Sequence, residues 1–288
     1  MTPAVVGAVL LAAVLHATWN ALAKGVEDRV TLFGRNGVLS VVLAFPVLLW
    51  VPAPARPSWP WLVASVVVHL FYTLALVAAY RVGEFNQTYP IARGVGPLTV
   101  AVVAVLLLHE RMSPATTAGV ALIAGAIALL GLTPWRTVRD NRAAVLTAVL
   151  TGLAIATYTV IDGIGVRRSD SPAGYTLWLV GLQGIGLAVV AFAVRRRRGA
   201  PTLAAGRTRG SSWPPALAIT VLSALAYGLV LWAQNRGALA AVAALRESSV
   251  IVAAVIGAVF FGESMGRLRI ACGVGLAVGA VLLTLPAS

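Results

Sequence analysis

The sequence contains one layout twice. Residues 89–132 read YPIARGVGPLTVAVVAVLLLHERMSPATTAGVALIAGAIALLGL, and residues 243–285 read AALRESSVIVAAVIGAVFFGESMGRLRIACGVGLAVGAVLLTL. At a constant offset of 153, Arg93 aligns with Arg246 and Glu110 with Glu263. Two shorter registers extend the match, aligning Tyr72 with Tyr227 and residues 17–19 with residues 156–158. The repeat predicts two related halves, which we assign to residues 1–136 and 137–288.

The chain also reads as a series of apolar segments of membrane length. Hydrophobic residues make up 59% of the 288 positions and charged residues 11%, which leaves a soluble protein almost no polar surface. Apolar runs of about 17 to 25 residues fall at approximately 3–23, 31–51, 59–80, 86–108, 114–133, 143–162, 173–194, 214–235, 240–261 and 266–285. Each half contains five spans, which is an odd number. The second five segments therefore enter the membrane from the side opposite to the first five. We therefore predict an all-α, multi-pass protein of the cell membrane, with ten transmembrane helices in two inverted five-helix repeats.

Basic residues are unevenly divided between the two sets of loops. The net charge is +13, which in a soluble protein would suggest nucleic acid, but most of these residues stand in short loops between spans. Fourteen follow odd-numbered spans and five follow even-numbered spans. Since positively charged loops stay in the cytoplasm, the bias predicts that both termini lie outside and that nucleic acid is no partner.

Three further arginines, Arg35, Arg93 and Arg246, lie inside apolar spans. A charge at that depth is expensive and normally faces a cavity or a partner, although arginines near span starts can also reach the headgroups along their stems. The equivalent positions of Arg93 and Arg246 favour function. Gly94, Gly96 and Pro97 would loosen the helix beside Arg93 and free backbone groups to line a cavity.

Other polar residues gather on the same spans as these arginines. Trp19, Asn20 and Lys24 share one helical face of the first span, and Lys24 is the only lysine of the chain. The candidate substrate-binding residues are Trp19, Asn20, Lys24, Arg35, His69, Tyr72, Tyr89, Arg93, Tyr158, Tyr227 and Arg246. Two simpler roles remain open: the aromatic residues can form an interfacial belt, and a histidine between helices can be purely structural.

Several motifs resemble one known superfamily. HATWNALAK in the first span, YPIARGVGPL in the fourth, the HE or GE that ends spans four and nine, and the five-plus-five duplication resemble the drug/metabolite transporters, specifically their ten-helix EamA-type members. The resemblance covers nearly the whole chain. It implies transport but no single substrate, because this scaffold moves amino acids, sugar phosphates, nucleotide sugars and drugs. It also implies cytoplasmic termini, against the charge bias.

Three classes of function differ in the residues that they require. A secondary transporter accounts for the inverted repeat and the polar residues within the spans, and no GxxxxGK[ST] loop is present for an ATP-driven pump. An enzyme would need a nucleophile or metal constellation, and the sequence offers three isolated histidines, one cysteine and no HExxH. A membrane scaffold would not need arginines at depth. We predict no enzyme activity, no metal site and no cofactor.

The charges within the spans indicate the substrate. The acids at depth are Asp162 and Glu247, which we assign to coupling or gating. Glu247 adjoins Arg246 and would partly neutralise it, which leaves Arg93 to bind the substrate. A net-positive lining favours a small anionic or zwitterionic metabolite such as an amino acid, organic phosphate or phosphonate. The predicted mechanism is alternating access, and the alternative is a multidrug exporter of the same superfamily.

Small residues in the last span predict close helix packing. Gly275 and Gly279 form GxxxG in the tenth span, and Gly119 and Gly125 recur in the fifth. Such patterns let helix backbones approach closely, either within the chain or between two copies. Cys272 is the only cysteine, so no intramolecular disulfide is possible. We expect a monomer or a weak homodimer, with substrate and membrane lipid as partners.

Overall fold

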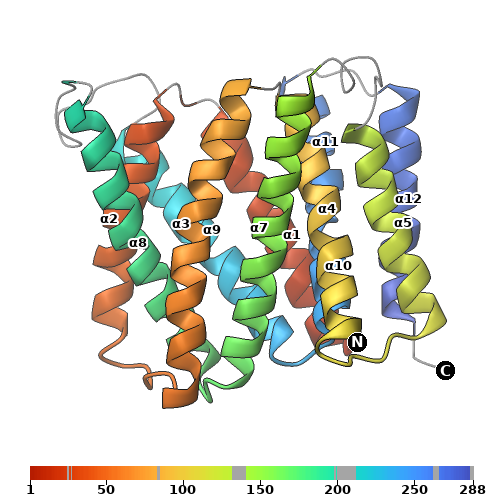
Figure 1. Cartoon of the computed structure of the whole chain (residues 1–288), viewed down its shortest axis with the longest axis horizontal. Helices are drawn as coiled ribbons and strands as arrows, with labels where there is room; N and C mark the ends of the chain where they lie inside the picture. The colour runs from red at the N-terminus through yellow and green to blue at the C-terminus, as the bar shows by residue number, and fades with distance from the viewer. Residues whose placement is uncertain are drawn as a thin grey trace.

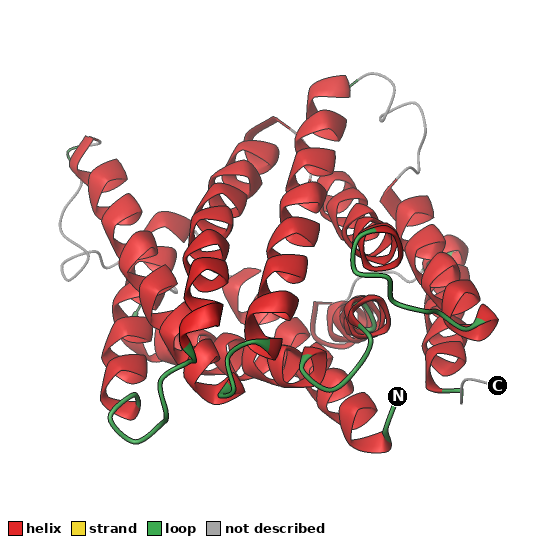
Figure 2. Ribbon diagram, turned by 60° about the horizontal axis from the view of Figure 1, so that its bottom comes forward, coloured by secondary structure: helices red, strands yellow, loops and turns green. Residues whose placement is uncertain are grey.

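The computed structural model describes residues 1–24, 26, 28–82, 85–131, 141–197, 199, 212–261 and 266–285, without the side chains of residues 29, 76–90, 131 and 261. Across these ranges the chain forms helices joined by short connections, and no strand occurs in them (Figures 1 and 2). The first half contains α1 (Pro3–Lys24), α2 (Arg29–Val47), the short 3₁₀ helix η1 (Arg56–Ser58), α3 (Trp59–Val82), α4 (Phe85–Leu106) and α5 (Pro114–Gly131). The second half contains α7 (Arg142–Arg167), α8 (Pro172–Arg197), α9 (Trp213–Gln234), α10 (Leu239–Arg246), α11 (Ser249–Phe261) and α12 (Arg267–Thr284).

The ten apolar segments of the sequence correspond to these helices. Each predicted span begins within two residues of a helix start, and the ninth span is divided into α10 and α11. Eight spans in the described part of the chain are long and apolar enough to cross a membrane. Two further apolar stretches, Ile91–Leu106 and Pro114–Leu130, are shorter. The all-α, multi-pass membrane fold is therefore confirmed.

The helices of the two halves interleave. α2 packs against α8, α5 against α12, α1 against α9 and α3 against α7. α2 and α8 are the second spans of their halves, and α5 and α12 are the fifth spans. The contact of α1 with α9 joins the first span of one half to the third span of the other. The contact of α3 with α7 is the same pairing with the two halves exchanged. A two-fold relation between the halves requires this pattern, so it supports the proposed repeats at 1–136 and 137–288.

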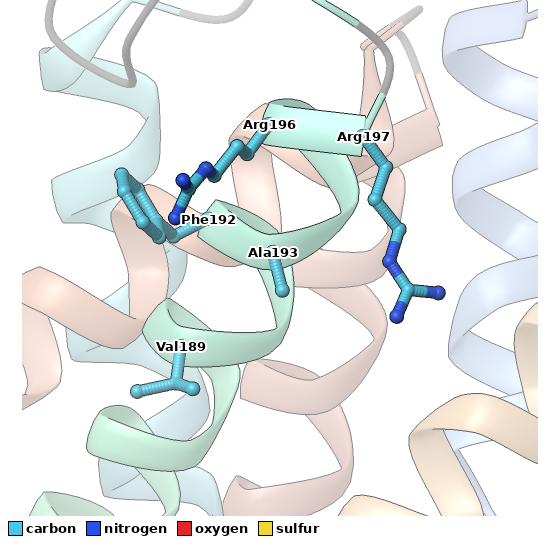
Figure 3. A pocket seen from close by; sticks show the side chains of 5 residues that line it. All are labelled: Val189, Phe192, Ala193, Arg196 and Arg197. Carbon is cyan, nitrogen blue, oxygen red and sulfur yellow. The ribbon is translucent and has the colours of Figure 1, made fainter.

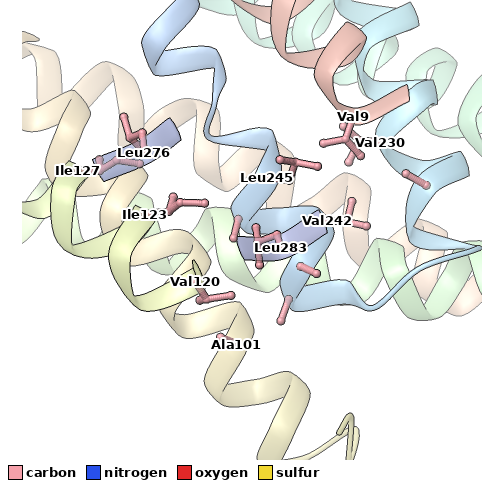
Figure 4. Packing of buried hydrophobic residues seen from close by; sticks show 14 of the residues in the cluster. Val9, Ala101, Val120, Ile123, Ile127, Val230, Val242, Leu245, Leu276 and Leu283 are labelled. Atoms are coloured by element: carbon pink, nitrogen blue, oxygen red, sulfur yellow. The ribbon is translucent and has the colours of Figure 1, made fainter. Parts of the chain in front are cut away.

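Glycine pairs bring two of these contacts to backbone distance. A Cβ placed on Gly37 of α2 would lie 2.5 Å from the carbonyl oxygen of Gly184 on α8. A Cβ on Gly119 of α5 would lie 2.8 Å from the carbonyl oxygen of Gly279 on α12. The predicted glycine packing in the tenth span is thus used within the chain. Beside it, the largest apolar cluster joins α5 and α12 to α10, α9 and α1 (Figure 4).

The start of α1 and the end of α12 lie at the same edge of the helical layer, at the bottom of Figure 1. We call this edge the termini face and the other edge the opposite face. If the charge bias sets the orientation, a reporter fused after Ser288 should read as extracytoplasmic. A cysteine introduced in the loop 199–210 should then be shielded from impermeant reagents in intact cells, whereas one replacing Asp170, which is exposed on the termini face, should react. The reverse labelling pattern would establish cytoplasmic termini.

Candidate functional site

A buried group of charges connects the two halves. The Nε of Arg93 on α4 lies 2.8 Å from Oε2 of Glu247, and Nη2 of Arg93 donates a 2.8 Å hydrogen bond to Oγ of Ser249. The Nε of Arg246 lies 3.7 Å from Oε1 of the same glutamate. Glu247 is fully buried, and both arginines are at most 6% exposed. We call Arg93, Arg246, Glu247 and Ser249 the ion-pair cluster.

The pairing of Glu247 differs from the sequence expectation. The carboxylate lies between two arginines and is closer to Arg93 than to its neighbour Arg246. The charge of Arg93 is therefore the more fully compensated of the two. Chain adjacency suggested instead that Glu247 would neutralise mainly Arg246.

A break in the ninth span places these residues together. α10 ends at Arg246 and α11 begins at Ser249. Between them the N–H of Glu247 donates to the carbonyl of Ala244 (3.0 Å) and that of Ser248 to Leu245 (3.1 Å). These bonds close three-residue turns, tighter than those of an α-helix. The break places Glu247 and Ser249 against Arg93 of α4.

The expected irregularity beside Arg93 is absent. α4 continues as one helix from Phe85 to Leu106, and its glycines serve packing. A Cβ on Gly94 would lie 3.1 Å from the backbone nitrogen of Ala128, and a Cβ on Gly96 would lie 3.2 Å from Ile155. α4 is thus held tightly between α5 and α7, and the irregular helix belongs to the other half.

The ion-pair cluster lies well inside the membrane. Arg93 is eight residues after the first residue of α4, and Arg246 is seven after that of α10. At about 1.5 Å per residue, the arginines lie about 10 to 12 Å from the two helix starts. These starts are at opposite faces (Figure 1), and the hydrocarbon layer is about 30 Å thick. With the helix starts at the two membrane surfaces, both arginines lie in the central part of this layer.

A second polar group surrounds Asp162 of α7. This carboxylate is fully buried and accepts hydrogen bonds from the hydroxyls of Tyr175 (3.1 Å) and Tyr227. The rings of His69 and Tyr158 stack with centroids 3.9 Å apart. Three further edge-on contacts complete the group, joining His69 to Tyr227, Tyr72 to Tyr158, and Tyr158 to Tyr227. We call these six residues the tyrosine cluster.

Arg246 connects the two clusters electrostatically. Asp162, His69 and Tyr158 all lie within electrostatic range of its guanidinium group. His16 on α1 lies within electrostatic range of both Arg93 and Arg246. The sequence therefore identified most of one continuous centre: of the predicted site residues, the structure brings together His69, Tyr72, Arg93, Tyr158, Asp162, Tyr227, Arg246 and Glu247.

Four predicted residues lie outside this centre. Trp19 contacts His16 edge-on with ring centroids 5.1 Å apart, and Asn20 donates a 2.8 Å hydrogen bond to the His16 carbonyl. Lys24 is exposed in the last turn of α1. Arg35 is buried on α2, with its guanidinium carbon 5.1 Å from the ring centroid of Trp213. The side chain of Tyr89 is outside the described residues.

Arg35 belongs to a separate group toward the opposite face. There Nη1 of Arg195 lies 2.9 Å from Oδ2 of Asp28 and also donates to Thr31. Burial raises the pKa of Asp28, but hydrogen bonds from Thr31 and Arg195 outweigh this effect and hold the pKa below its ordinary value. These contacts tie the end of α8 to the start of α2.

Sequence reasoning missed Tyr175 and Ser249. Tyr175 looks like any aromatic residue of an apolar span, yet it is fully buried on Asp162. A buried aspartate needs hydrogen-bond donors from neighbouring helices. That need could have pointed to Tyr175 as a partner of Asp162. Ser249 was the third residue after Arg246, and only the helix break directs its hydroxyl to Arg93.

The polar centre is distinct from the pocket drawn in Figure 3. That pocket, of about 540 Å³, is lined by Val189, Phe192, Ala193, Arg196 and Arg197 on α8. Val189 and Phe192 are largely exposed, as expected of a lipid-facing surface. Among the residues that the structure describes, no three His, Cys, Asp or Glu side chains lie close enough to hold a metal ion.

Comparisons with known proteins point to one family. Residues 142–285 match the EamA-like transporter family. A crystal structure described only as "Crystal structure of protein" is similar in fold, with a TM-score of 0.73 over 98% of this chain and 96% of that chain, at 15% identity. No curated protein matches the chain.

Proposed function

The chain belongs to the EamA-like transporter family, and from this premise we propose that it carries a small zwitterionic or anionic metabolite across the membrane. The family is one of transporters and not of enzymes, so the enzyme alternative is set aside. The substrate class and the mechanism are inferences from the buried polar centre.

The ion-pair cluster carries the substrate proposal. Two guanidinium groups face one carboxylate, Glu247, in the middle of the membrane. One positive charge is therefore in excess within the cluster, at a depth where an uncompensated charge is costly. A carboxylate, phosphate or phosphonate would compensate it and accept paired hydrogen bonds from the fork of Arg246.

A buried hydroxyl beside this cluster supports a ligand there. Oγ of Ser248, at the helix break, has no hydrogen-bond partner in the described part of the chain. Buried polar groups are normally paired, so such a group calls for a water or a substrate atom. Ser248 lies at the same helix break as Arg246 and Glu247.

The tyrosine cluster suits the other end of a zwitterion. Asp162 supplies a negative charge, and the faces of Tyr158 and Tyr227 can attract an ammonium group. An amino acid or aminophosphonate would then place its acid group at Arg246 and its amine toward Asp162. Such a ligand completes both clusters without adding net charge.

The same residues offer one argument for the alternative. An acid enclosed by aromatic rings is a site for a lipophilic cation, and Asp162 with Tyr158, Tyr227 and His69 has that composition. A multidrug exporter would bind there and leave Arg246 unused. A scaffold that transports nothing would use neither cluster.

A thermal-shift screen separates these proposals. Purified protein is heated with neutral amino acids, with organic phosphates and phosphonates, and with quaternary ammonium dyes. A zwitterion at about 100 times its Kd should stabilise the protein by about 2.7 kcal/mol. Arg168→Gln is the matched control, because this arginine stacks on Trp61 at the protein surface; it should keep the shift that Arg246→Gln loses.

Stabilisation by the dyes alone would replace the metabolite proposal with the multidrug alternative. A zwitterion shift that survives Arg246→Gln unchanged would remove the ion-pair cluster as the binding site. Transport of the ligand so identified would then be measured in proteoliposomes.

A further inference from the structure

At the termini face, one carboxylate closes the contact between the two halves. Glu110 stands in the loop after α4, where His109 adopts the left-handed conformation (φ 53°) and the chain turns back. Oε2 and Oε1 of Glu110 lie 2.9 and 3.2 Å from the backbone nitrogen of Leu239. Leu239 is the first residue of α10. A side chain of the first half thus accepts a hydrogen bond from a backbone N–H at the start of a helix of the second half, where such groups lack partners within the helix.

Arg167 adds a second connection at the same place. This last residue of α7 has its Nη2 3.0 Å from Oε1 of Glu110. It also donates to the carbonyls of Gln234 (2.9 Å) and Gly237 (2.8 Å). These carbonyls end α9 and precede α10. Arg167 therefore fixes the α9–α10 turn at the point where Glu110 holds α10.

An apolar layer separates these contacts from the ion-pair cluster. Val100 of α4, Ala156 of α7, and Leu239 and Ala243 of α10 form one buried cluster, and Leu108 packs against it. Passing inward from the termini face, one meets first Glu110, then this layer, then Arg93 with Glu247. α4 and α10 are joined along this whole length.

From this arrangement we infer that Glu110 and Arg167 are the latch of a gate that closes the central site to the termini face. We call Glu110, Arg167 and Leu239, with the apolar layer of Val100 and Ala243, the termini-side gate. The inference rests on the proposed alternating access. To open this face, α4 and α10 must separate, and the bonds of Glu110 must break.

The side chains of the latch are partly exposed to water, as expected of a contact that breaks and re-forms. The side chains of Glu110 and Arg167 are 14% and 34% exposed, so water can replace their bonds when the halves part. The side chains of Arg93 and Glu247 are only 6% and 1% exposed. The gate is therefore weakest at the surface, where opening has to begin.

Site-directed labelling tests the gate without a substrate. In a Cys272→Ala background, the Ala243→Cys probe reports on the apolar layer, and an impermeant maleimide is added to the termini side of membrane vesicles. Glu110→Gln keeps one oxygen that can accept from Leu239, but it removes the ion pair with Arg167 and the negative charge at the start of α10. It should therefore raise the labelling rate about tenfold, the factor that about 1.4 kcal/mol produces. Asp170→Asn, which removes an exposed carboxylate from the same face, should leave the rate unchanged.

A second probe distinguishes opening from general loosening. Ala216 is buried near the start of α9, toward the opposite face. Labelling of Ala216→Cys from the termini side should not rise with Glu110→Gln. Equal gains at both probes would show a destabilised fold and overturn the gate.

Exchanging the charges tests the helix cap within the latch. In Glu110→Arg/Arg167→Glu, a simple ion pair would be restored. The N–H of Leu239 would lose its acceptor, because an arginine side chain has none, and a positive charge would face the helix start unfavourably. We expect this double variant to label as fast as Glu110→Gln, and a return to the slow rate would overturn the proposed latch.

The outcome separates the gate from the transport proposal. Unchanged labelling in Glu110→Gln, together with normal uptake, would remove the gate and leave the transporter intact. Side-specific labelling in a protein that carries none of the three ligand classes would retain the gate and remove the proposed substrate.

Discussion

Arg93→Ala is expected to abolish transport and to destabilise the protein more than any other single change in the polar centre. It removes the 2.8 Å partner of Glu247 and the donor to Ser249. Glu247 is fully buried and would keep only Arg246, 3.7 Å away. Breaking a buried ion pair by removing one partner costs about 3–5 kcal/mol. Thermal unfolding and proteoliposome uptake measure the two effects.

Companion variants separate charge balance from substrate binding. Arg93→Ala/Glu247→Ala removes both charges and should recover most of the lost stability without recovering uptake. Arg93→Lys keeps the charge but not the planar fork, so it should restore stability more than transport. Full uptake by Arg93→Ala would remove the ion-pair cluster from the mechanism.

Arg246→Ala should behave differently from Arg93→Ala. Glu247 would retain its closer partner, so we expect a smaller loss of stability. Ligand binding should nevertheless be lost, because Arg246 carries the less compensated charge. If Arg246→Ala binds the ligand normally while Arg93→Ala does not, the roles inferred from the two distances are exchanged.

Gly184→Ala should destabilise the protein strongly at the α2–α8 contact. The added Cβ would lie 2.6 Å from the carbonyl oxygen of Gly37 and 2.8 Å from Cβ of Ser40. A backbone atom cannot swing aside as a side chain can, so the helices would have to separate. Overpacking typically costs about 1–3 kcal/mol, and we expect the upper end here. Yield of folded protein and thermal unfolding measure the loss.

Gly7→Ala is the matched control on α1. Nothing lies within 4 Å of a Cβ at Gly7, and alanine is the better helix former by about 0.5–1 kcal/mol. This variant should be neutral or slightly stabilising. If Gly184→Ala folds as well as Gly7→Ala does, the two helices are not in the backbone contact described.

The spans were predictable because they depend on local sequence. Apolar length and the charges or prolines at each end locate a membrane helix almost independently of its neighbours. The third span, predicted at 59–80, is the helix Trp59–Val82. The division of the ninth span was not predictable in this way, since residues 239–261 read as one apolar run. Its break places Glu247 opposite Arg93, a residue of another helix.

The same distinction applies to the site. Arg93, Arg246 and Asp162 were identified because a charge within an apolar span is conspicuous. Their partners were not, because Tyr175 and Ser249 acquire their roles from helix rotation and packing. Gly94 was misread for the same reason. A glycine beside a charge can loosen a helix, or it can let a neighbouring helix approach closely. The second role depends on where α5 packs, which the local sequence does not show.

The helix break also has a consequence for symmetry. At the offset of 153, Glu247 corresponds to Gly94 and Ser249 to Gly96, so the arginine is duplicated while the acid and the serine are not. An ancestral pair of identical halves would have carried two acids at this position or none. Because only one half carries an acid at this position, the ion-pair cluster is asymmetric although the two halves are related by a repeat. The proposed zwitterion would therefore bind in one preferred orientation, and it would enter through one membrane face and leave through the other without turning round.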